Sequence, residues 1–125
     1  MPARGRLVGL FGQLVNGVES KGISIETRPG AQVVTPYDGK VVFAGPFRGY
    51  GQLLIIEHGE GYHTLLAGFS RIDSSLGQWL LAGEPVGVMG RRSNGGPVLY
   101  IELRQGGVAI NPLLWLAADE KKVSG

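Results

Sequence analysis

The sequence predicts an all-β fold, a β-sandwich of antiparallel sheets with one short helix near the C-terminus. Glycine accounts for 22 of the 125 residues, against a usual share of about 7%. The glycines separate short apolar runs and follow no collagen period, which is typical of turns and bulges between strands. The runs themselves alternate apolar and polar residues, as strands with one buried face do.

The strands are expected between glycine-rich turn sequences. Segments with the strand pattern are 22–26, 33–34, 40–44, 52–58 and 62–67. The turns between them read PG at 29–30, YDG at 37–39, RGYG at 48–51 and GEG at 59–61. Strands at this spacing favour antiparallel sheets folded into a sandwich or a partly closed barrel.

The second half of the chain repeats part of this pattern. SLGQWLLAGEPVGVMG echoes RPGAQVVTPYDGKVVFAG, which suggests two interlocking hairpin units. GGPVLYIELRQGGVAINPLLWL then has a glycine-rich approach, an alternating strand and a second short strand. Two stretches have a helical pattern, 71–76 and 112–118, and the second has Asn111 as N-cap and Pro112 at its first position.

Composition predicts one domain over residues 1–118, followed by a polar tail at 119–125 that frays. With 43% hydrophobic and 18% charged residues, the chain can form a core. The net charge is only +2 and no basic face is clustered, which disfavours nucleic-acid binding. The absence of cysteine excludes disulfides and thiol chemistry.

The sequence gives no sign of membrane insertion or of a leader. No apolar run approaches the ~20 residues of a membrane-spanning helix, and the N-terminus lacks the shape of a signal peptide. If the protein is exported, we expect this chain to be a mature fragment or an excised domain.

Metal chemistry has two candidate ligands, His58 and His63, which flank the GEG turn on neighbouring strands. A hydrolytic zinc site needs about three ligands and an open position for water, and no third ligand is evident. The simpler interpretation is one half-buried structural histidine and one exposed histidine. No cofactor is expected.

Other catalytic motifs are weaker still. No serine lies in a G-x-S-x-G turn, and GRRSNGGP lacks the ending of a phosphate loop, so we expect it to be a surface loop. Lys40 is the one candidate for a carrier lysine, without the flanking signature of such carriers. Asp38, Glu57 and Glu102 could act as paired carboxylates, but nothing selects a pair.

The order of the motifs resembles a LytM-type domain, the fold of zinc glycyl-glycine endopeptidases that cut peptidoglycan cross-bridges. The resemblance runs from about residue 2 to 116, through SKGISIETRPGAQVVTPYDGKVVFAG, FRGYGQLLIIEHGEGYHTLLAGFS, LGQWLLAGEPVGVMG and GGPVLYIELRQGGVAINPLLWL. It implies the duplicated-hybrid-motif form of the β-sandwich.

The chain departs from the active members at every catalytic position. By this resemblance the zinc-ligand positions hold Ser20, Ser24 and Tyr100, and the catalytic histidine positions hold Gly68 and Val98. His58 matches a family position that is not a ligand. Hydroxyl groups bind zinc far more weakly than imidazole or carboxylate. The resemblance therefore implies a degenerate, non-catalytic LytM domain without zinc, similar to the C-terminal domain of EnvC-type murein hydrolase activators.

That resemblance implies a function for the vacated groove. Activators of this type bind zinc-dependent N-acetylmuramoyl-L-alanine amidases in the periplasm during septum splitting in cell division. They draw an inhibitory regulatory helix of the amidase into the groove. Full-length relatives dock on an FtsEX-type division complex through regions absent from this chain.

The groove is expected to be concave and mostly neutral, and an amphipathic helix could bury its apolar face there. Its expected residues are Lys21, Ile23, Ser24, Tyr50, Gly68, Val98, Tyr100 and Arg104. Simpler roles are open for four of them. Tyr50 could cover a turn and Tyr100 could pack in the core, while Arg104 could pair with a surface acid and Lys21 could be an ordinary solvated lysine. Two other functions also stay open, a module that binds peptidoglycan in the cleft and a residual metallo-endopeptidase that uses His58 and His63.

Overall fold

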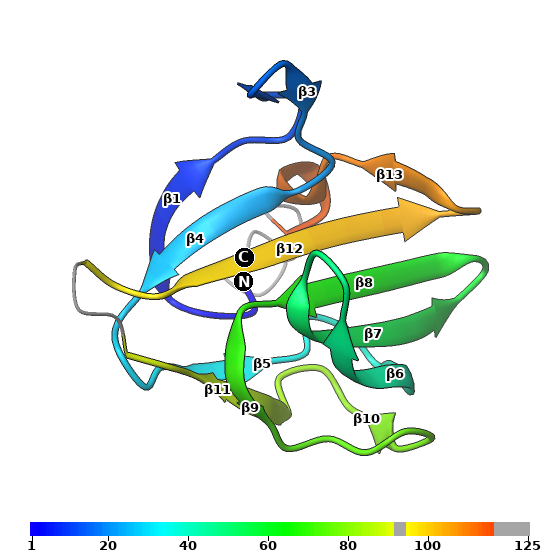
Figure 1. Cartoon of the computed structure of the whole chain (residues 1–125). Helices are drawn as coiled ribbons and strands as arrows, with labels where there is room; N and C mark the ends of the chain where they lie inside the picture. Colours follow the sequence, from blue (N-terminus) through cyan, green and yellow to red (C-terminus); the bar gives the residue numbers. More distant parts are fainter. Residues whose placement is uncertain (92–94, 117–125) are drawn as a thin grey trace, which may run out of the picture.

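The computed structural model describes residues 1–91 and 95–116 (Figure 1), and within them strands are the main secondary structure. The strands are β1 (Gly5–Gly9), β2 (Leu14–Val15), β3 (Val18–Glu19), β4 (Ile23–Thr27), β5 (Gln32–Val34), β6 (Gly39–Phe47), β7 (Gly51–Gly59), β8 (Tyr62–Ala67), β9 (Phe69–Ile72), β10 (Trp79–Leu80), β11 (Pro85–Met89), β12 (Val98–Gln105) and β13 (Val108–Ile110). A short helix covers 112–116. The predicted all-β class with antiparallel sheets is confirmed.

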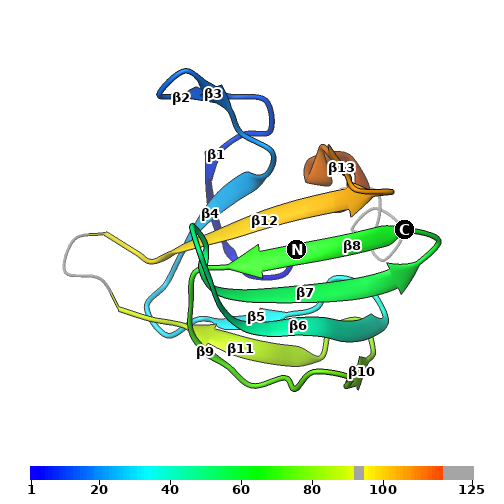
Figure 2. The same ribbon diagram turned by 45° about the vertical axis from the view of Figure 1, so that its right-hand side comes forward.

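One large antiparallel sheet forms the framework. Its strand order is β1-β4-β12-β8-β7-β6-β10, and β13 pairs with β12 outside this path. A second sheet of three strands, in the order β5-β11-β9, packs across it (Figure 2). Strand β12 lies in the middle of the large sheet, so its side chains reach both the core and the opposite face.

The core lies between these two sheets. Leu99 and Ile101 of β12, and Leu54 of β7, are fully buried there against Val86 of the small sheet. On β12 the residues that alternate with them, Val98, Tyr100 and Glu102, face the other way. The alternation in 98–103 therefore sets which side chains of β12 are available on the outer face.

A smaller apolar cluster covers part of that outer face. Leu53, Leu65 and Ala67 are buried on it beneath partly buried neighbours, namely Phe43, Tyr50, Ile55 and Tyr100. The turn between β6 and β7 carries Tyr50 over this cluster, and the amide of Tyr50 donates to the carbonyl of Phe47 at 3.0 Å. The cluster gives the outer face a packed floor.

The two helix predictions have different outcomes. The predicted helix at 71–76 is wrong, because Ile72 and Arg71 belong to β9 and pair with Gly87 and Val88 of β11. At the C-terminus the prediction is confirmed for 112–116, where the Asn111 Oδ1 accepts a hydrogen bond of 3.1 Å from the amide of Leu113. Residues 117–118, the polar tail at 119–125 and residues 92–94 of the expected surface loop lie outside the described residues.

Two strands at the N-terminus form a hairpin that the sequence analysis did not predict. Leu14 pairs with Glu19 and Val15 with Val18, so that Asn16 and Gly17 form the turn. Both turn residues have positive φ, 52° and 79°, as a two-residue hairpin turn of the I′ type requires. The hairpin projects away from both sheets (Figures 1 and 2).

Candidate partner-binding groove

The candidate site lies on the outer face of the large sheet, across strands β4, β12 and β8. Tyr100 of β12 pairs with Ser24 of β4 on one side and with Ala67 of β8 on the other. Paired residues point to the same face, so these three side chains form one row. Tyr50 reaches this row from the turn between β6 and β7.

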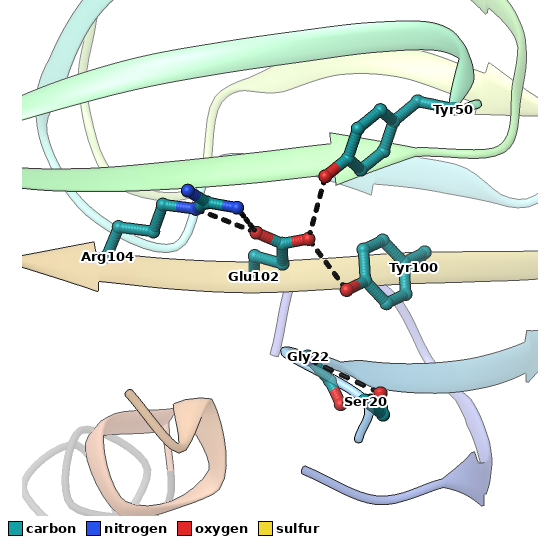
Figure 3. Close-up of polar contacts among 6 residues, drawn as sticks. All are labelled: Ser20, Gly22, Tyr50, Tyr100, Glu102 and Arg104. Carbon is teal, nitrogen blue, oxygen red and sulfur yellow. Dashed lines mark hydrogen bonds and ion pairs between the residues drawn. The ribbon is translucent and has the colours of Figure 1, made fainter. Parts of the chain in front are cut away.

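The centre of the site is a buried carboxylate. Glu102 is only 1% exposed, and both of its oxygens accept hydrogen bonds (Figure 3). The hydroxyl groups of Tyr50 and Tyr100 donate to Oε2 at 3.1 Å and 2.7 Å. The guanidinium of Arg104 binds Oε1, through Nε at 2.8 Å and through a terminal nitrogen at 2.7 Å. A buried carboxylate is tolerated only with such compensation, because removing it from water is expensive.

These contacts hold both phenols in their protonated form. Burial raises the pKa of Tyr100 above the ordinary value of 10.0, and the hydrogen bond and charge of Glu102 raise it further. Burial followed by the charge of Glu102 raises the pKa of Tyr50 as well. The hydrogen bond to Glu102 raises the pKa of Arg104. At neutral pH both tyrosines are therefore phenol donors, and Arg104 is a guanidinium cation.

Gly68 follows Ala67 of this row, and its backbone conformation leaves no room for a side chain. Its φ is +111°, a conformation that side-chain-bearing residues rarely adopt. A Cβ atom there would lie 2.3 Å from the carbonyl oxygen of Val98. Together with Gly49, Tyr50, Ala67 and Tyr100, these two residues line a pocket of about 410 Å³. The structure thus brings together four of the predicted groove residues: Tyr50, Gly68, Val98 and Tyr100.

Two of the other predicted groove residues, Lys21 and Arg104, line a second pocket together with Ser20. This pocket, of about 420 Å³, is lined by Phe11, Gly12, Glu19, Ser20, Lys21, Arg104, Gly107, Val108 and Ala109. Lys21 is exposed on its rim. The Ser20 hydroxyl forms a local turn, in which it donates to the carbonyl of Gly22 at 3.0 Å (Figure 3). Arg104 therefore links the two pockets, because it lines the second and binds the carboxylate beside the first.

One predicted groove residue is misplaced. Ile23 is completely buried in the core between the two sheets, opposite Ile101 of β12. Its neighbour Ser24 faces the groove, and adjacent residues of a strand point to opposite faces, so Ile23 cannot line the groove floor.

Glu102 was named only as one of three candidate catalytic carboxylates and was missed as a groove residue, although it binds Tyr50, Tyr100 and Arg104. A signal was present in the sequence: Glu102 stands two residues from both Tyr100 and Arg104, on the polar face of an otherwise apolar strand. The simpler roles considered for Tyr50 and Arg104 are incomplete, because both bind this buried acid.

The two histidines do not share a site. His58 lies between the carbonyl of Asp38, 2.7 Å from Nδ1, and the hydroxyl of Thr64, 2.6 Å from Nε2. His63 follows on β8 with its Nε2 3.7 Å from a carboxylate oxygen of Glu57. Thr64 and His63 are adjacent in one strand, so the two imidazoles lie on opposite faces. Across 1–91 and 95–116, no three His, Cys, Asp or Glu side chains are grouped to hold a metal ion.

The chain is similar in sequence to a peptidase family and to proteins named murein hydrolase activators. Residues 18–112 match the model of peptidase family M23. The chain is 34% identical to the murein hydrolase activator EnvC of Escherichia coli over 117 residues, which is 92% of this chain and 28% of that protein. It is also 34% identical to the murein hydrolase activator NlpD of the same organism over 119 residues, 92% of this chain and 30% of that protein. This chain thus spans under a third of either relative.

Solved structures share the fold at lower identity. Helicobacter pylori Csd3 superposes with a TM-score of 0.81 at 23% identity, covering 92% of this chain and 32% of that one. Among the described residues, no helix is long and apolar enough to span a membrane.

Proposed function

The chain belongs to peptidase family M23, and we propose that it is a non-catalytic member that activates a zinc-dependent peptidoglycan amidase. The observation that carries the proposal is the hydrogen-bond network around Glu102 on the outer face of the large sheet. Two tyrosines and an arginine stand there in place of metal ligands. Two of its relatives, EnvC and NlpD, are named murein hydrolase activators.

The groove geometry argues against catalysis. The Tyr100 hydroxyl donates to Glu102, and its raised pKa opposes the phenolate form that would bind a metal. The backbone at Gly68 leaves no space even for a Cβ, so a histidine at this position would require the junction of β8 and β9 to move. A single substitution therefore does not restore a peptidase site.

The same groove is suited to hold a helix. Tyrosine and arginine dominate the binding energy of many interfaces, and Tyr50, Tyr100 and Arg104 are fixed by their shared bonds to Glu102. Side chains that are already ordered lose less conformational entropy on binding. Lys21 adds an exposed cation at the rim, which favours a helix with acidic residues on its polar side.

In this account the amidase is held inactive by a regulatory helix, and binding of that helix in the groove leaves the amidase active for septum splitting. The activator acts in the periplasm, and an FtsEX-type complex recruits it through regions outside this chain. Peptidoglycan itself is a second candidate partner. Residues 1–118 form one domain that carries the groove.

A binding titration tests the proposal. A fluorescein-labelled peptide of an amidase regulatory helix is titrated with the 125-residue chain and followed by fluorescence anisotropy. Tyr100→Phe should weaken binding, because it removes the hydroxyl group that donates to Glu102 and keeps the aromatic ring. Trp79→Ala is the matched control, since Trp79 is 74% exposed in β10, away from the groove. Saturable binding that Tyr100→Phe leaves unchanged would place the partner elsewhere.

A further inference from the structure

Within residues 1–91 and 95–116, a run of exposed apolar side chains lies beside the groove, in and before the β2–β3 hairpin. Leu14 and Val18 are each 67% exposed, Val15 is 55% exposed and Leu10 is 48% exposed. The segment 7–18 contains no charged residue. Exposed apolar patches of this kind are typical of interaction sites.

The hairpin is held by its own backbone. The amide of Gly12 donates to the carbonyl of Ser20 at 2.8 Å, and the amide of Ser20 donates to the carbonyl of Gln13 at 2.8 Å. A two-stranded ribbon by itself is only marginally stable in water. These bonds nevertheless fix its base at Ser20, next to Lys21 of the groove rim, so the arm has a defined direction.

The second pocket connects this hairpin to the groove. Phe11, Gly12 and Glu19 form one side of the pocket, Val108 and Ala109 of β13 form the other, and Lys21 and Arg104 also line it. Leu14 pairs directly with Glu19, so both belong to the same face of the hairpin. Val108, on the opposite side, is 65% exposed. A ligand in this pocket would lie between two exposed aliphatic side chains.

The centre of the groove floor is polar, so it covers only part of the apolar stripe of a docked helix. This centre consists of two phenol groups, a carboxylate and a guanidinium, whereas an amphipathic helix binds mainly through its apolar stripe. The hairpin supplies aliphatic side chains at the place where the floor is polar. Continuity with the groove makes the amidase helix the occupant that fits this surface.

We propose that the β2–β3 hairpin is an apolar arm that packs against the regulatory helix of the amidase, with Leu14 and Val108 on either side of it. This inference rests on the proposed function. The groove network fixes the polar contacts of the helix, and the hairpin buries its apolar stripe. Leu14 is the arm residue tested, because it shares a face with Glu19 of the pocket. Val18 pairs with Val15 and lies on the other face of the hairpin.

The test uses the anisotropy titration with two matched variants. Leu14→Ser, the arm variant, removes one aliphatic side chain from the pocket-facing side of the hairpin, and Leu76→Ser, the control, removes the same side chain elsewhere. Leu14 is 67% exposed and Leu76 is 71% exposed. Burying one such side chain is worth enough for about a tenfold change in affinity, so the arm variant should bind about tenfold more weakly. The control should match the wild type.

Photo-crosslinking gives a second readout that does not depend on affinity. A benzoylphenylalanine at position 14 should crosslink to the labelled helix, and one at position 76 should not. Equal affinities for the arm variant and the wild type, with no crosslink from position 14, would overturn the arm while leaving the groove intact. No helix binding by the wild type would overturn the proposed function and the arm together.

Other occupants of the hairpin are distinguished in the same experiment. The wild type is tested for self-association by light scattering and for sedimentation with vesicles of anionic phospholipid. If the arm variant abolished either behaviour while its affinity for the helix stayed unchanged, a second copy or a lipid surface would be the occupant of the hairpin. Either result overturns the inference.

Discussion

Gly68→Ala should destabilise the fold strongly, because two separate effects meet at this position. The φ of +111° is unfavourable for a residue with a Cβ, by roughly 1–3 kcal/mol. The new methyl group would also lie 2.3 Å from the carbonyl oxygen of Val98, so the backbone of β8 or β12 must shift, at a cost of about 1–3 kcal/mol. Together these effects predict a loss of roughly 2–6 kcal/mol, with the middle of the range near 4 kcal/mol.

Urea denaturation measures this loss and separates the two effects. With a urea dependence of about 1.5–2 kcal/mol per M, the midpoint should fall by about 2 M. Gly83→Ala is the matched control, because Gly83 has a φ of +86° and nothing within 4 Å of its added Cβ. The control should lose only the conformational part.

Equal losses for Gly68→Ala and Gly83→Ala would refute the reasoning. The contact with Val98 would then be relieved by small local movements. The structural explanation for the absence of a side chain at this groove position would fall with it.

Three further predictions concern the groove and the core. Arg104→Met should lower the free energy of unfolding by about 3 kcal/mol, because Glu102 stays buried without its cation; adding Glu102→Gln should recover part of this loss in the same denaturation assay. Lys21→Glu should weaken amidase activation with an unchanged melting temperature, since Lys21 is exposed; a fall in both would indicate a structural role. Burial lowers the pKa of His58 below its ordinary value of 6.5, so the folded state favours the neutral imidazole. Its contribution to stability is complete above about pH 6.5 and is lost as the pH falls towards the folded-state pKa. Thermal melts of the wild type and His58→Asn should converge over that range, and parallel curves would contradict it.

The sequence pattern predicted which side chains of β12 share the outer face, but it did not predict the buried carboxylate of Glu102 there. Strict alternation placed Val98 and Tyr100 opposite Leu99 and Ile101, and the structure agrees. Tyr100 and Arg104 lie two residues from Glu102 in the sequence, but the burial of Glu102 also depends on Tyr50, which comes from a turn 52 residues earlier in the chain. Long-range contacts of this kind carry no local signal.

Two errors have physical causes that are visible in the sequence. Ile23 and Ser24 are neighbours in a strand, and a shared face for both contradicts the two-residue period of strands. The segment 71–76 has weak helical character, and pairing of β9 with β11 overrides it. The β2–β3 hairpin had a clear signal that was not used, the Asn16–Gly17 pair between two apolar runs.

Dye release from labelled peptidoglycan tests the central claim most directly. The purified chain is incubated with the substrate alone and together with a zinc-dependent amidase, in each case with and without added zinc. We expect release only when both proteins are present, with the amidase alone close to background. Zinc-dependent release by this chain alone would contradict the account, because the groove around Glu102 would then hold a working peptidase site.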